Sequence, residues 1–113
     1  MPFNNNKQYL GFIEDNLTYK NKPIGFNYLK YLGITHIQFM PIFDFTGIDE
    51  LNPEKAYNWG YNPNQLFIPE GSYSKDPNDS YKRINEVKKM IDTLHKEGFN
   101  VIMDVVYNHV DVY

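Results

Sequence analysis

Three polar residues of different chemistry follow one another near the end of this 113-residue chain. Asp104 lies inside an apolar run over residues 100–107, and Asn108 and His109 close that run. An ionised carboxylate among apolar side chains is unfavourable unless a polar group lies close by, so Asp104 needs a hydrogen-bond partner. In parallel α/β folds, ligands bind at the carboxyl ends of strands. The three residues together form a candidate ligand site, although each one alone is more simply interpreted as the polar end of a buried strand.

Two strands are predicted to carry this site. The run over residues 100–107 is apolar on both faces, which is typical of a strand buried on both sides in a parallel sheet. A second strand is predicted over residues 34–42, where Pro41 cannot donate a ladder hydrogen bond and should end or bend the strand. Each strand follows a helix end and a glycine, Gly33 or Gly98, so the chain repeats one pattern.

A helix is predicted before each strand. The first opens at Pro23, carries three apolar residues at helical spacing and stops at Gly33. Those apolar residues are Phe26, Leu29 and Leu32.

The second helix begins at a cap on Asp79 or Ser80 and ends at Gly98. Its buried stripe is predicted to consist of Ile84, Val87, Ile91 and Leu94, with Met90 beside it. Its solvent side is predicted to carry Lys82, Glu86, Lys89, Asp92, Lys96 and Glu97. Asp92 and Lys96 have the spacing of a favourable ion pair within a helix.

The other segments lack sustained periodicity. Residues 1–22 are polar and predicted to be irregular, and residues 43–78 are punctuated by proline and glycine. A loop this long at the end of a strand is usually functional. The order helix, strand, long loop, helix, strand indicates a parallel α/β array. A (β/α)₈ barrel needs roughly 250 residues, so the chain is either a very small α/β domain or, as its end just past the second strand favours, a fragment of a larger one.

Composition narrows the classes of function. The net charge is −3 and there is no basic cluster, so no nucleic-acid partner is expected. Cysteine is absent, which excludes disulfides and thiolate chemistry. No apolar stretch is long enough to span a bilayer and no secretory leader is evident, so we expect a cytoplasmic protein without membrane contact. Aromatic residues make up 17% of the chain and suit both sugar faces and ordinary cores.

The long loop contains the segment Tyr57-Asn58-Trp59-Gly60-Tyr61-Asn62-Pro63, followed by Pro69-Glu70-Gly71-Ser72-Tyr73-Ser74. With these segments the chain resembles type I pullulanases, debranching enzymes of the α-amylase clan (glycoside hydrolase family 13). The likeness continues at residues 104–109, which resemble that clan's first conserved region, and at residues 33–45, which resemble its second barrel strand. Position 62 is often Asp in such relatives, and position 110 is often Thr.

The resemblance implies a fold and an activity. The fold would be α/β, a fragment of a (β/α)₈ TIM barrel with roughly the second and third strands, the intervening helices and a long βα loop. Residues 1–113 would then be part of a catalytic domain. The parent activity would be hydrolysis of α-1,6-glucosidic bonds in pullulan, starch or glycogen, with an α-glucan as the partner.

The resemblance also implies roles for individual residues. Tyr61 would stack under the glucose ring at the cleavage subsite, and His109 would hydrogen-bond its hydroxyl groups. Asp104 would orient its neighbours, and Trp59 would belong to the substrate wall or support the loop. Asn108 lies where many amylases bind calcium, which would be the one cofactor. Packing within the loop is the alternative for Tyr61 and Trp59, and a capping or core role is the alternative for His109.

The resemblance assigns no catalytic residue to this chain. In the clan, the nucleophile Asp, the acid/base Glu and a stabilising Asp follow the fourth, fifth and seventh strands, and retaining glycosidases need such a carboxylate pair. No two acids in this sequence are expected to share a pocket, so we expect the fragment to be inactive alone and to self-associate through its open strand edges. The alternatives are an isoamylase or glycogen-debranching enzyme, or a non-enzymatic carbohydrate-binding module, which would usually be all-β.

Overall fold

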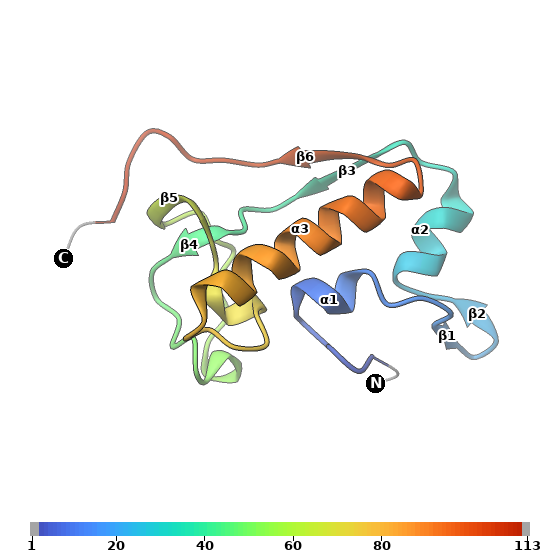
Figure 1. Cartoon of the computed structure of the whole chain (residues 1–113), viewed down its shortest axis with the longest axis horizontal. Coiled ribbons are helices and arrows are strands. Elements are labelled where there is room, and N and C mark those ends of the chain that lie inside the picture. Colours follow the sequence, from blue (N-terminus) through green and yellow to red (C-terminus); the bar gives the residue numbers. More distant parts are fainter. Residues whose placement is uncertain (1–2, 112–113) are drawn as a thin grey trace.

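The computed structural model describes residues 3–111 (Figure 1). Its α-helices are α1 (Tyr9–Phe12), α2 (Phe26–Leu32) and α3 (Ser80–Lys96). Its strands are β1 (Thr18–Tyr19), β2 (Lys22–Pro23), β3 (His36–Phe39), β4 (Phe43–Phe45), β5 (Pro63–Pro69) and β6 (Asn100–Met103). Two 3₁₀ turns, η1 (Pro53–Lys55) and η2 (Gly71–Tyr73), lie on either side of β5.

The two predicted strands pair with each other in parallel. His36 of β3 lies opposite Asn100 of β6, and the register runs on to Phe39 and Met103. Backbone hydrogen bonds continue past both strand ends, from Asn100 N to the Thr35 carbonyl (2.8 Å) and from Asp104 N to the Phe39 carbonyl (3.1 Å). The carboxyl ends of β3 and β6 therefore lie side by side, and the chain leaves both of them toward the β4–β5 region (Figure 1).

Both predicted helices are present and their ends have local causes, but the predicted start of the first was wrong: α2 begins at Phe26, and Pro23 lies in β2. α2 stops at Gly33, whose φ of +69° is a left-handed conformation that glycine adopts without strain. The Asp79 carboxylate caps α3 by accepting a hydrogen bond from Lys82 N at 3.1 Å. Lys96 and Asp92 form the predicted ion pair at 2.7 Å on the exposed side of α3.

One apolar core joins the two helices, the strand pair and the N-terminal segment. α3 runs along one face of the β3–β6 pair, and α1 packs against α3 (Figure 1). The buried apolar residues of this core are Tyr9, Phe26, Ile37, Met90, Leu94 and Phe99. Met90 and Leu94, one turn apart on α3, are almost wholly buried, so α3 supplies the centre of the core.

The prediction that the last strand spans residues 100–107 and is buried on both sides was wrong. β6 ends at Met103, and Ile102 remains 43% exposed. Alternation decides which side is covered: Val101 and Met103 face the helices, whereas Asn100 and Ile102 face away from them. The side chains that alternate onto that second face, His36, Gln38, Asn100 and Ile102, are all exposed.

The predicted buried stripe of α3 is rotated from the observed one. Ile84 is 38% exposed, whereas Glu86, which was predicted to face solvent, is 6% exposed. The Glu86 carboxylate is buried because it accepts hydrogen bonds from Lys75 N, in the loop before the helix. A polar side chain with a backbone partner can occupy a position that hydropathy assigns to solvent.

The segments predicted to lack regular structure contain short elements. Residues 1–22 include α1, in which Tyr9 is buried and donates a hydrogen bond from its hydroxyl to the Glu70 carbonyl at 2.7 Å. Residues 1 and 2 lie outside the described part. The long loop contains the antiparallel pair β4–β5, with irregular register at Asp44.

The described strands form three two-stranded sheets, so a closed barrel is not present within residues 3–111. None of the helices there is long and apolar enough to cross a membrane.

Candidate functional site

Two predicted site residues meet at the carboxyl end of the strand pair. Asp104 follows β6 directly, and its Oδ2 accepts a hydrogen bond from the Tyr61 hydroxyl at 2.5 Å. The carboxylate therefore has the polar partner that its place in the sequence requires. The hydrogen bond to Asp104 raises the pKa of the Tyr61 hydroxyl above its usual range. Tyr61, which like any tyrosine is protonated at neutral pH, acts here as a hydrogen-bond donor.

A glycine brings Tyr61 to this position. Gly60 has a φ of +87°, and a Cβ placed on it would lie 2.6 Å from the Pro41 carbonyl oxygen, just past the end of β3. Only glycine allows both the left-handed backbone and this close approach. Gly60 N also donates to the Asn58 side-chain oxygen at 2.8 Å, which closes a tight turn. The loop is thus held against β3 with the Tyr61 side chain directed toward Asp104.

Exposed aromatic side chains lie within a few residues of the pair in the sequence. Trp59 is 61% exposed and Tyr107 is 63% exposed, whereas Tyr61 itself is 39% exposed. Phe67 packs against Tyr107 with ring centroids 6.4 Å apart and against Phe43 at 6.0 Å. Flat amphipathic rings with free faces, next to a carboxylate and a phenol, suit a ligand that combines apolar faces with hydroxyl groups.

The remaining predicted residues lie near this edge without joining the pair. Asn108 and His109 are exposed and follow the strand end by a few residues. The hydrogen bonds found within residues 3–111 do not include the side chains of Trp59, Asn108 or His109. The structure therefore brings together Tyr61 and Asp104, and it leaves His109 and Trp59 accessible to a ligand.

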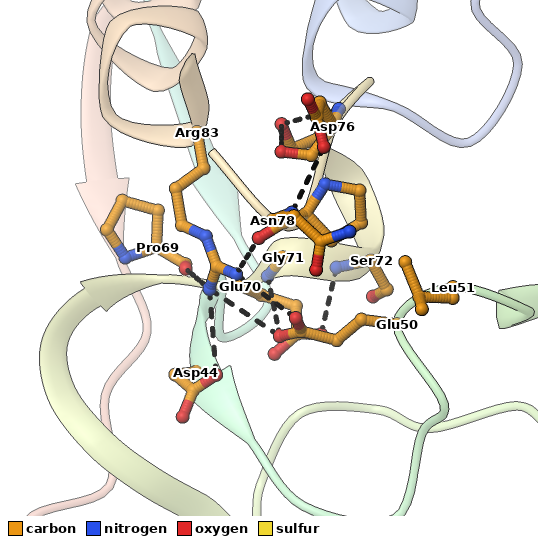
Figure 2. A network of polar contacts seen from close by, with 12 residues as sticks. Asp44, Glu50, Leu51, Pro69, Glu70, Gly71, Ser72, Asp76, Asn78 and Arg83 are labelled. Atoms are coloured by element: carbon orange, nitrogen blue, oxygen red, sulfur yellow. Dashed lines mark hydrogen bonds and ion pairs between the residues drawn. The ribbon is translucent and has the colours of Figure 1, made fainter. Parts of the chain in front are cut away.

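Sequence reasoning missed a cluster of acids in the region of β4 and the end of β5. Asp44, Glu50 and Glu70 bring carboxylate oxygens within 4.8 Å of one another, which corrects the expectation that no two acids share a pocket. Arg83 of α3 extends into the cluster (Figure 2). Its guanidinium lies 3.0 Å from Glu50 Oε2 and 3.9 Å from Asp44 Oδ1, and it also donates to the Pro69 carbonyl at 3.1 Å.

Glu70 is the fully buried member of this cluster. Its carboxylate accepts hydrogen bonds from Phe45 N at 3.0 Å and Ser72 N at 3.1 Å, so it holds β4 against the turn after β5. Burial raises the pKa of Glu70, and its hydrogen bonds offset part of that effect. These partners give Glu70 a structural role. Glu70 belongs to the segment Pro69–Ser74 that carries the pullulanase resemblance, but nothing in the sequence indicates that its side chain is buried.

The calcium site suggested for Asn108 stays a prediction. Only one group of three or more acidic or histidine side chains close enough to share a metal is found within residues 3–111, and it lies around Arg83. Arg83 already places a cation among those carboxylates.

A separate cavity of about 510 Å³ lies between the N-terminal segment and the loop around η1. Its walls are mainly apolar and include Tyr9, Phe12, Phe39 and Tyr57. Neither Tyr61 nor Asp104 lines it, so it is distinct from the edge described above.

Comparison with known proteins relates the chain to one class of carbohydrate-active enzymes. No protein-family model matches the chain. It is 50% identical over 107 residues to the pullulanase of Bacillus subtilis (strain 168), and the match covers 94% of the chain. It is 34% identical over 107 residues to pullulanase 1, chloroplastic, of Arabidopsis thaliana, covering 69% of the chain.

Solved structures give the same relation. A pullulanase from Anoxybacillus sp. LM18-11 complexed with maltotetraose matches with a TM-score of 0.93 and 49% identity over 96% of the chain. The type I pullulanase of Bacillus subtilis complexed with maltose matches with a TM-score of 0.92 and 47% identity. The chain spans 15% of the length of the Bacillus subtilis relative and 16% of the Anoxybacillus chain. It is therefore similar, in sequence and in fold, to one segment of the pullulanases.

Proposed function

We propose that this chain is the glucan-contacting segment of a debranching glycoside hydrolase that cleaves α-1,6-glucosidic bonds. The observation that carries the proposal is the Tyr61–Asp104 pair at the carboxyl ends of two parallel strands, in a segment 50% identical to a pullulanase. The Anoxybacillus pullulanase is complexed with maltotetraose in its crystal structure, which supports an α-glucan as the ligand of this segment.

The roles proposed for the edge follow from its chemistry. Tyr61 has an accessible ring that can stack on a glucose face while its hydroxyl is held by Asp104. His109 is exposed and free to turn toward sugar hydroxyl groups. Trp59, the single tryptophan of the chain, is exposed enough to form part of the same surface.

We further propose that the segment supplies binding and not bond cleavage. Hydrolysis with retention needs two carboxyl groups about 5–5.5 Å apart on either side of the scissile bond. The clustered acids of this chain are instead occupied by Arg83 and by backbone amides, and Glu70 has no exposed surface. On this proposal, the isolated chain does not hydrolyse pullulan or starch.

The proposed fold of the intact protein is a (β/α)₈ barrel in which β3 and β6 are the second and third strands. The parallel pairing of β3 with β6 supports this, as does the helix α3 on one side of the pair. The uncovered sheet face with Gln38 and Ile102 would then point into the barrel, where side chains of other strands would cover it. A carbohydrate-binding module is disfavoured, because such modules are usually all-β and this core is built on α3.

Titration of the purified chain with maltotetraose tests the proposed binding. Because Trp59 is the single tryptophan and is exposed, its fluorescence reports contact at this edge directly. We expect a saturable change that is lost in Tyr61→Ala and kept in Tyr81→Ala, which removes an exposed tyrosine on α3. A saturable change unaffected by Tyr61→Ala, or no change at millimolar sugar, would contradict the proposal.

A reducing-sugar assay with pullulan tests the absence of cleavage. We expect no release above that of a buffer blank, even at high protein concentration. Turnover that follows the protein through a second purification would show that the acids of this chain are sufficient for hydrolysis.

A further inference from the structure

A single threonine connects the two segments that carry the candidate site. Thr46 follows β4, is 8% exposed and has hydrogen bonds at its backbone and at its side chain. Its carbonyl accepts hydrogen bonds from Asn58 Nδ2 at 2.7 Å and Asn62 Nδ2 at 2.8 Å. Its backbone N donates to the Asn62 carbonyl at 3.1 Å. Thr46 thus holds both ends of the turn that contains Tyr61.

The hydroxyl of Thr46 extends this connection to the end of the chain. Thr46 Oγ1 accepts a hydrogen bond from Asn62 Nδ2 at 2.8 Å and donates one to Asp111 Oδ2 at 2.6 Å. Asp111 N in turn donates to the Pro63 carbonyl at 2.8 Å. A hydroxyl can donate one hydrogen bond and accept up to two. The Thr46 hydroxyl therefore uses its single proton for Asp111 and accepts from Asn62.

These bonds fix the segment that presents His109. At one end, Asp104 is held by Phe39 through its backbone N and by Tyr61 through its side chain. At the other end, Asp111 is held by Thr46 and Pro63. The exposed residues between these two points belong to a loop whose ends are both tied to the Tyr61 turn, although they have no hydrogen bonds of their own within residues 3–111.

We infer that Thr46 is a positioning residue that sets the relative placement of Tyr61 and His109 through the side chains of Asn62 and Asp111. The expected effect on glucan binding rests on the proposed function. The effect on the positions of Tyr61 and His109 depends only on the hydrogen bonds described above. Thr46 is buried beneath the loops that it joins, so its proposed role is positioning and not contact with the ligand. It acts by joining the side chains of the two loops, beside the backbone hydrogen bond from Asp111 N to the Pro63 carbonyl and the Tyr61–Asp104 hydrogen bond.

The identity of residue 62 matters for this arrangement. As Asn, it donates both of its side-chain protons to Thr46, which leaves the hydroxyl proton of Thr46 for Asp111. A carboxylate at position 62 would have no proton to donate and would compete with Asp111 for that hydroxyl. Asn62→Asp should therefore release Asp111 while leaving Thr46 in place.

The test compares Thr46→Val, which keeps the shape and removes the hydroxyl, with Thr46→Ser, which keeps the hydroxyl. Tyrosine labelled with ¹³C at Cζ gives one resonance per tyrosine, and Tyr61→Phe identifies that of Tyr61. The Tyr61 resonance, its titration with pH, and the affinity for maltotetraose are measured on each variant of the full chain. Thr93→Val, which removes a hydroxyl bonded to the Lys89 carbonyl on α3, is the matched control.

We expect Thr46→Val to move the Tyr61 resonance and to lower the pKa of Tyr61 toward that of a free tyrosine, because the hydrogen bond to Asp104 is loosened. Glucan affinity should fall about three- to tenfold, the range for loss of one hydrogen bond. Thr46→Ser should restore both properties, and Thr93→Val should change neither. If Thr46→Val and Thr46→Ser behave alike, the hydroxyl has no positioning role and the inference is wrong.

Asp111→Ala keeps the inference testable if Thr46→Val does not fold. Asp111 is only partly buried, so its removal should leave the core intact. We expect the resonances of the His109 ring to shift and to narrow, as for a loop freed at one end. Unchanged His109 resonances would contradict the inference. If no variant or wild-type chain binds glucan but the Tyr61 and His109 resonances respond as expected, the proposed function fails and the positioning role stands.

Discussion

Removal of the Arg83 guanidinium is the most direct way to test what holds the acid cluster of Asp44, Glu50 and Glu70 together. Arg83 is 12% exposed by side chain, and its partners Asp44 and Glu50 are 15% and 30% exposed. Arg83→Met keeps the length and apolar body of the side chain while leaving three carboxylates without their cation. It also removes donors to the Pro69 and Pro77 carbonyls.

The expected loss of stability follows from this burial. Breaking a fully buried ion pair from one side costs about 3–5 kcal/mol. Two features place Arg83 at the lower end of that range: water can reach Glu50, and Arg83 Nε is buried without a hydrogen bond within residues 3–111. We therefore expect Arg83→Met to lower the free energy of unfolding by about 3 kcal/mol.

Urea denaturation followed by far-ultraviolet circular dichroism measures this loss. Lys96→Met is the control, because the Lys96–Asp92 pair is exposed at both ends and such pairs contribute about 0.5 kcal/mol or less. Arg83→Lys should fall between Arg83→Met and wild type, since it keeps the charge without the forked donors. A loss of less than about 1 kcal/mol for Arg83→Met would refute the reasoning that this cation holds the acids together.

Three further predictions concern the loop, the buried acid and the strand edges. Gly60→Ala should cost about 2 kcal/mol more than Gly33→Ala in urea denaturation, because both glycines have positive φ but only Gly60 would place a Cβ against backbone; equal losses would contradict this. Glu70 has a raised pKa in the folded state, so its contribution to stability should increase as pH falls from neutral toward its usual value of 4.5 and then level off. Stability measured against pH should therefore rise less steeply on acidification in Glu70→Gln than in wild type, and parallel curves would show that Glu70 does not titrate in this way. The chain should form dimers or larger assemblies by light scattering coupled to size exclusion, since β3 and β6 each have one partner in the described sheet; a monomer at every dilution would show that these edges do not pair.

The sequence predicts the elements whose cause is local or periodic. α2 and α3, the stop at Gly33, the cap at Asp79 and the strand beginning at Asn100 all follow from spacing and from residue type. The need of Asp104 for a polar partner also follows from its place in an apolar run, and Tyr61 meets that need.

What the sequence does not predict depends on contacts between distant segments. Glu86 has the chemistry of a surface residue, but a backbone amide eleven positions earlier makes its burial favourable. Tyr9 lies in a polar segment without periodicity, yet it reaches the Glu70 carbonyl 61 positions away. The connection from Thr46 to Asp111 spans 65 positions. No local pattern encodes such pairs, so the arrangement of the site beyond Tyr61 and Asp104 required the structure.

The central claim is that the edge formed by Tyr61, Asp104 and His109 binds an α-glucan. Backbone and side-chain resonances of the chain, recorded during titration with maltotetraose, test it most directly. We predict saturable shifts concentrated at residues 57–62 and 104–111, with none at the solvent side of α3. Shifts confined to the apolar cavity near Tyr9 and Phe12, or an absence of shifts at millimolar sugar, would contradict the claim.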